Sequence, residues 1–127
     1  MYSIVEPTQV RNYWWFVRKG LEHILRKSPE HWIPEDVYAS LVSNKSNLWI
    51  WTENDQAVGF IIGYVVEDSF HIWCAYGKLS DLSKSFADFE DIVRGQCKRI
   101  TFESWRPGWD KVARTLGFSP RGWIKEL

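Results

Sequence analysis

The chain has few cysteines, no net charge and no long apolar run. Its two cysteines, Cys74 and Cys97, are too few for a disulfide scaffold, and each lies in or beside an apolar segment, where a reduced, buried thiol is ordinary. Its 16 basic residues balance its 16 acidic residues, so no overall field draws the chain to nucleic acid, and we do not expect a nucleic-acid partner. No segment approaches the roughly 18 apolar residues that a membrane span requires.

Targeting and metal-binding signals are also missing. The segment from Met1 to Pro7 lacks a basic region followed by an apolar run, so we expect a soluble, unexported protein of the cytoplasm. The three histidines, His23, His31 and His71, have no ligand-like spacing with the cysteines, so we expect no metal. A length of 127 residues predicts one domain over residues 1–127.

Tryptophan, in contrast, is abundant, with nine in 127 residues. A tryptophan-rich core is one explanation. The other is that some of the rings remain partly exposed, because large amphipathic rings are favoured at interfaces. The second explanation predicts a protein partner, or self-association, through an aromatic surface.

Hydrophobic periodicity predicts a mixed α/β (α+β) domain. Residues at helical spacing predict helices over about 9–27, 34–42, 79–95 and 108–116, and runs rich in β-branched and aromatic residues predict strands over 2–5, 48–52, 57–66, 69–76, 99–103 and 121–125. The order is β-α-α-β-β-β-α-β-α-β, with a mixed central sheet of about six strands. The helix over 79–95 predicts a crossover and hence a parallel pair of strands on either side of it.

This order resembles the GNAT superfamily of acyl-CoA-dependent N-acyltransferases across nearly the whole chain. Two local segments carry the resemblance: Trp51–Phe60, which is similar to the family's hairpin, and Val112–Phe118, in which a short helix ends in Leu-Gly-Phe before a new strand. The resemblance implies a GNAT-like single domain. It also implies that the backbone of the strand containing Ile72, Trp73, Cys74 and Ala75 would contact the cofactor arm.

The family's phosphate-binding loop is only partly present. The family has Gln/Arg-x-x-Gly-x-Gly/Ala before a helix, where free backbone amides and the helix dipole hold the pyrophosphate. Here the segment is Ala75–Leu82, with one glycine, Gly77, and with Asp81 adding negative charge. Lys78 and Ser80 could compensate in part. The other interpretation is a turn in which Ser80 or Asp81 caps the helix.

The family's usual catalytic side chains are absent as well. Ala113 stands where the family commonly has the tyrosine that protonates the leaving thiolate, and Arg106 matches its asparagine. A general base would then come from His71 or Glu103, which lie on strands that neighbour each other in this fold. Each of the two could instead be an ordinary structural or exposed residue.

The segment Ser104–Trp109 is the most unusual local sequence. Trp105 and Trp109 flank Arg106 and Pro107 at the end of a strand, where open α/β sheets present ligands and partners. Stacking on the rings, together with the arginine fork, predicts a partner or substrate surface at Trp105, Arg106 and Trp109. A packed turn covering the sheet is the alternative.

Two functions follow from these observations. The first is a divergent GNAT-like domain that binds or assembles without a cofactor. It is similar to the short GNAT-like proteins of tailed bacteriophages, which would place it in the host cytoplasm or in the virion. The second is an active acyl-CoA-dependent N-acyltransferase with an unusual site, using acetyl-CoA, because positioning alone can supply much of catalysis.

Overall fold

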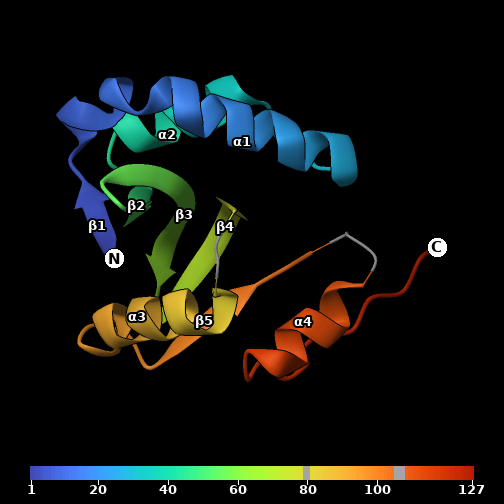
Figure 1. Ribbon diagram of the computed structural model, residues 1–127. Helices are drawn as coiled ribbons and strands as arrows, with labels where there is room; N and C mark the ends of the chain where they lie inside the picture. The colour runs from blue at the N-terminus through green and yellow to red at the C-terminus, as the bar shows by residue number, and fades with distance from the viewer. Residues whose placement is uncertain (79–80, 105–107) are drawn as a thin grey trace.

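A computed structural model describes residues 1–78, 81–104 and 108–127, and it is built on one five-stranded mixed sheet (Figure 1). Four strands pair antiparallel in chain order, and β5 joins β4 in parallel. The predicted fold class and the predicted parallel pair are confirmed. The strands are β1 (Tyr2–Val5), β2 (Asn47–Glu53), β3 (Gln56–Val66), β4 (Ser69–Gly77) and β5 (Arg99–Phe102).

Two tight turns set the register of the central strands. Asn54 and Asp55 connect β2 to β3, and both have positive φ (51° and 62°), which is the backbone of the hairpin turn that matches strand twist. Glu67, with φ of 56°, lies in the two-residue connection between β3 and β4. Both connections fall where the sequence predicts turns.

The helices cover the sheet on both faces. Figure 1 shows α1 and α2 over one face and α3 over the other, with α4 beside β5. The two faces have separate cores, because residues of alternating strand positions point to opposite sides. Val17, Leu21 and Val37 fill the first core, and Phe70 and Phe89 fill the second. The helices are α1 (Trp14–Lys27), α2 (Pro34–Val42), α3 (Leu82–Arg94) and α4 (Trp109–Thr115).

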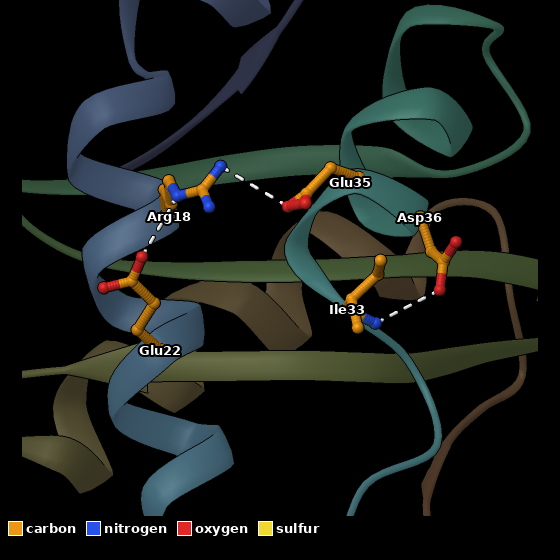
Figure 2. A network of polar contacts seen from close by, with 5 residues as sticks. All are labelled: Arg18, Glu22, Ile33, Glu35 and Asp36. Carbon is orange, nitrogen blue, oxygen red and sulfur yellow. Dashed lines mark hydrogen bonds and ion pairs between the residues drawn. The ribbon is translucent and has the colours of Figure 1, made fainter.

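Ion pairs connect α1 to α2 at the surface (Figure 2). Arg18 Nε donates to Glu22 Oε1 at 3.0 Å, and Arg18 Nη1 lies 3.4 Å from Glu35 Oε1. At the start of α2, the Ile33 amide donates to Asp36 Oδ2 at 3.1 Å. These groups are exposed, so each pair contributes only about 0.2–1 kcal/mol. The two helices are held mainly by the apolar core beneath them.

One predicted element is absent and one differs at its start. Residues 121–125, predicted as a sixth strand, are exposed and do not form one, because they have no partner strand with which to form ladder hydrogen bonds. The predicted helix over about 9–27 is divided into a 3-10 helix over Pro7–Asn12 and then α1. Within the described residues, no helix has both the length and the apolar character that crossing a membrane requires.

Tyr2 gives the fold a measurable dependence on pH. Burial raises the pKa of its phenol to about 12, a hydrogen bond with Ser85 partly offsets this, and the Asp88 carboxylate adds to it. A proton held more tightly in the folded state stabilises the fold fully below pH 10, the ordinary pKa of the phenol, and this contribution is lost as the pH rises toward 12. Between about pH 8 and about pH 11, we expect the wild type to lose roughly 1.4 kcal/mol more than Tyr2→Phe in urea unfolding. Equal losses in the two chains would contradict the assignment.

Candidate functional site

Strands β4 and β5 are paired only along the first half of β4. Their pairing ends at Ile72 and Phe102, whereas β4 continues to Gly77 with β3 as its neighbour. Among the described residues, no strand pairs with Trp73–Gly77 on the β5 side. One edge of this stretch therefore offers backbone N–H and C=O groups that could receive an extended ligand.

A bulge redirects β4 at this opening. The β3–β4 register shifts at Gly63, so that Ile62 faces Cys74, Gly63 faces Ile72, and Trp73 has no partner. A Cβ on Gly63 would run into the His71 carbonyl oxygen and would lie 2.6 Å from a ring carbon of Phe70. The register of the β2–β3 pair also shifts, between Trp51 and Thr52, and Trp51 faces Gly59 there. Both irregularities of the sheet thus lie at or beside a glycine of β3, as is common where a strand bulges or another backbone comes close.

The predicted cofactor-contacting residues divide by burial. The side chain of Cys74 is buried in the α1/α2-side core, and burial raises the pKa of its thiol, so it stays a neutral packing group. Ile72 packs on the α3-side core and Trp73 on the α1/α2-side core, whereas Ala75, Gly77 and Lys78 are exposed. Ser80 lies outside the described residues.

Backbone amides around the predicted phosphate loop already have partners within the chain. The Lys78 amide donates to the Val58 carbonyl at 2.9 Å. At the start of α3, Asp81 is the N-cap, and its Oδ1 accepts from the Lys84 amide at 3.1 Å. The interpretation of Asp81 as a helix cap is confirmed. A carboxylate thus occupies the end of α3 where the helix dipole favours an anion.

The two candidate bases lie at the same end of the sheet. His71 on β4 faces Thr101 on β5, and His71 Nδ1 and Thr101 Oγ1 share a hydrogen bond of 2.9 Å. Glu103 follows two residues after Thr101, just beyond β5, and is exposed. Both His71 and Glu103 line one groove at the edge of the sheet. Their catalytic roles stay predictions.

The last helix carries no proton donor at the position of the family's tyrosine. Ala113 lies half-buried in α4, and its methyl group cannot protonate a thiolate. Trp109, at the start of α4, is half-buried, with its ring centroid 6.0 Å from that of Phe102. Part of the Trp109 side chain is therefore covered by packing on Phe102. Trp105 and Arg106 lie outside the described residues.

A groove of about 1250 Å³ runs along the free edge of β5. The consecutive residues 99–104 all line it, although neighbouring strand residues point to opposite faces. A space lined by side chains of both faces must run along the edge of the strand. Residues 118–122 line it as well, and we call it the edge groove.

Sequence reasoning missed Thr101 and the edge groove. Thr101 lies within β5, and only the β4–β5 register places it against His71. The groove depends on whether residues 121–125 pair with β5, and their strand-like composition gave the wrong answer. Within the described residues, no group of three His, Cys, Asp or Glu side chains is placed to hold a metal ion.

Comparison with known proteins finds structural similarity without detectable sequence similarity. No protein-family model matches the chain, and no curated protein matches its sequence. The ribosomal-protein-alanine N-acetyltransferase from Brucella melitensis biovar Abortus 2308 superposes with a TM-score of 0.70 at 10% identity, covering 100% of this chain and 99% of that one.

Two further solved structures agree with this. A predicted acetyltransferase with acetyl-CoA from Clostridium acetobutylicum gives a TM-score of 0.68 at 14% identity, covering 100% of this chain and 94% of that one. An aminoglycoside acetyltransferase from an uncultured soil metagenomic sample, in complex with sisomicin, gives 0.67 at 10% identity, with coverage of 100% and 93%. At such low identity the likeness shows the fold, and this chain has the GNAT fold of the acetyltransferases.

Proposed function

We propose that this chain uses a GNAT fold as a binding or assembly protein and does not transfer acyl groups. The observation that carries the proposal is the Asp81 carboxylate on the Lys84 amide at the start of α3. A coenzyme pyrophosphate bound there would meet a carboxylate already on the helix N-terminus, and like charges at such close range repel. The bond from the Lys78 amide to Val58 adds to this argument, because it removes another donor.

Two exposed tryptophans support the proposal that the chain binds a protein partner. Trp15 on α1 is 72% exposed and Trp123 is fully exposed, and exposed tryptophans are favoured as anchors in protein interfaces. The further suggestion of a bacteriophage protein rests on the short chain and the eroded motifs alone. Its test is the genomic neighbourhood of the coding sequence.

Active N-acyl transfer is the second candidate. The free edge of β4 from Trp73 to Gly77 favours it, because an acyl-CoA arm could pair with that backbone. His71 and Glu103 would then supply a base beside the opening. Such an enzyme must bind acetyl-CoA before anything else, so a binding measurement decides between the two functions.

A thermal-shift and calorimetric titration with acetyl-CoA and free CoA provides that measurement. We expect no saturable binding and an unchanged Tm up to millimolar ligand. A site with micromolar affinity would instead stabilise the fold by about 2.7 kcal/mol at a hundredfold excess over its Kd, which raises the Tm of a domain of this size by several degrees.

If acetyl-CoA does bind, two charge-reversal variants show whether it binds at the predicted phosphate loop. Lys78→Glu would abolish cofactor binding at the predicted loop, whereas Lys19→Glu, on the exposed side of α1, makes the same charge change elsewhere. Saturable binding that is lost in Lys78→Glu and kept in Lys19→Glu would overturn the proposal in favour of acyl transfer.

A further inference from the structure

The outward side of α1, together with the 3-10 helix before it, carries a local surplus of positive charge. Over residues 7–27 the only acidic residue is Glu22, and its carboxylate already pairs with Arg18. Arg11, Lys19 and Arg26 are exposed, and among the residues that the structure describes none of the three has an ion pair. Although the whole chain is neutral, such a patch attracts an anionic partner.

An exposed tryptophan lies among these charges. Trp15 lies between Arg11 and Lys19 in the sequence, and its side chain is 72% exposed. The period of the α-helix places Lys19 about one turn and Arg26 about three turns beyond Trp15, on the same side of α1. A large ring is costly to leave in water, and tryptophan and arginine are favoured as anchors of protein interfaces. This side of α1 therefore offers a partner both an apolar anchor and a charge.

A small cavity between α1 and α2 offers a second apolar contact. It has a volume of about 260 Å³ and is lined by Arg11, Trp14, Arg18, Glu35 and Tyr38, and we call it the α1/α2 pocket. The ring centroids of Trp14 and Tyr38 lie 4.8 Å apart in an edge-to-face contact. Arg18 is neutralised by its carboxylate partners (Figure 2), so Arg11 supplies the unpaired charge. The pocket therefore suits an apolar side chain that has an acidic neighbour.

The distribution of charge favours a protein over a nucleic acid as the partner. By helical spacing, Glu22 lies on the same side of α1 as Lys19 and Arg26 and between them in the sequence, and Glu35 lines the pocket. A nucleic-acid strand carries a phosphate on every nucleotide, so some phosphates would meet these carboxylates, and like charges repel. A protein segment can place acidic residues opposite the cations and uncharged residues opposite the carboxylates.

We propose that this face of α1 is the docking surface for an acidic segment of a partner protein. The segment places an apolar side chain in the α1/α2 pocket, packs on Trp15, and brings carboxylates to Arg11, Lys19 and Arg26. We call these four residues and the pocket the α1 surface. Complementary charge steers the two proteins together and fixes the register of the segment. This inference rests on the proposed function, since it names the chemistry of the partner that a binding protein would take.

A random-peptide display library, selected on the immobilised wild-type chain at physiological ionic strength, supplies the probe. The enriched peptides should have a net negative charge and a large apolar residue. Calorimetry with one enriched peptide should show binding that is weaker by about tenfold or more in Trp15→Ala and in Arg11→Glu/Lys19→Glu. A peptide whose apolar residue is replaced by serine should lose affinity for the wild type in the same way.

The double variant Lys45→Glu/Lys98→Glu is the matched control, because it makes the same charge change at exposed positions away from α1. Lys98 also lines the edge groove, so this control reports a peptide that binds there instead. The control should bind the peptide as the wild type does, and all variants should keep the circular dichroism spectrum of the wild type.

Several results would overturn the α1 surface. These are a selection that yields no binder, enriched peptides without negative charge, and affinity that survives both α1 variants or falls in the control. Tighter binding at this surface by oligothymidylate, or by phosphatidylglycerol vesicles, would replace the protein partner by a nucleic acid or a lipid and would also overturn it. Acetyl-CoA binding by a chain that passes these tests would overturn the proposed function and leave the α1 surface standing.

Discussion

Replacing Phe89 by alanine is expected to lower the free energy of unfolding by about 3–5 kcal/mol. Phe89 is fully buried on α3 and is the centre of the α3-side core. Its ring lies 5.3 Å from Tyr2, 5.4 Å from Phe70 and 5.9 Å from Trp49, between ring centroids. One truncation therefore removes contacts to β1, β2 and β4 together and leaves a cavity that these rigid rings cannot fill.

Urea unfolding followed by tryptophan fluorescence measures this loss. Trp15→Ala is the matched control, because it deletes a larger ring from an exposed position and should change stability by no more than about 0.5 kcal/mol. A loss in Phe89→Ala as small as that in the control would mean that α3 does not pack on the sheet as described.

The substitution Gly63→Ala should cost about 1–3 kcal/mol or more, although it adds a single methyl group. That methyl would run into the carbonyl oxygen of His71 and would meet the ring of Phe70 at 2.6 Å. A backbone oxygen within a sheet cannot turn aside as a flexible side chain can. We therefore expect the methyl to push β3 and β4 apart at the bulge beside Trp73, at the candidate site.

Thermal unfolding by circular dichroism gives the size of the effect. Gly95→Ala is the matched control: the nearest atom to its new methyl is the Ile92 carbonyl oxygen at 3.9 Å, and its φ of −71° suits alanine. The control should be neutral or more stable by about 0.4–1 kcal/mol. A Gly63→Ala chain as stable as Gly95→Ala would show that the bulge is not tightly packed.

Most of the helices, strands and turns could be predicted from the sequence, because the residue spacing or turn residues that specify each element lie within that element. The spacing of Phe86, Phe89 and Val93 predicts α3, and the turn residues Asn54 and Asp55 predict the β2–β3 hairpin; both follow from contacts close in sequence. The segment 121–125 shows the limit of such patterns. Its composition favours a strand, but a strand exists only where a partner supplies hydrogen bonds, and composition does not name that partner.

The candidate site was predictable only in outline. The crossover through α3 places His71 on β4 and Glu103 just beyond the end of the neighbouring β5, and Asp81 was one of two capping candidates. The bond between His71 and Thr101 depends on the register of a parallel pair, which no hairpin turn fixes. The burial of Cys74 agrees with the apolar segment around it, but the core that receives its thiol depends on which side of β4 the bulge leaves facing α1.

The two-residue turns on either side of β3 also have a kinetic consequence. Loops this short carry the smallest closure entropy in the chain, so we expect β2, β3 and β4 to form the meander from which folding starts. Strand β1 must be recruited across the intervening helices, and β5 must wait for α3 to dock. A nascent chain would therefore form the free edge of β5 last, so that this edge becomes available for pairing with another molecule only after the other strands have paired.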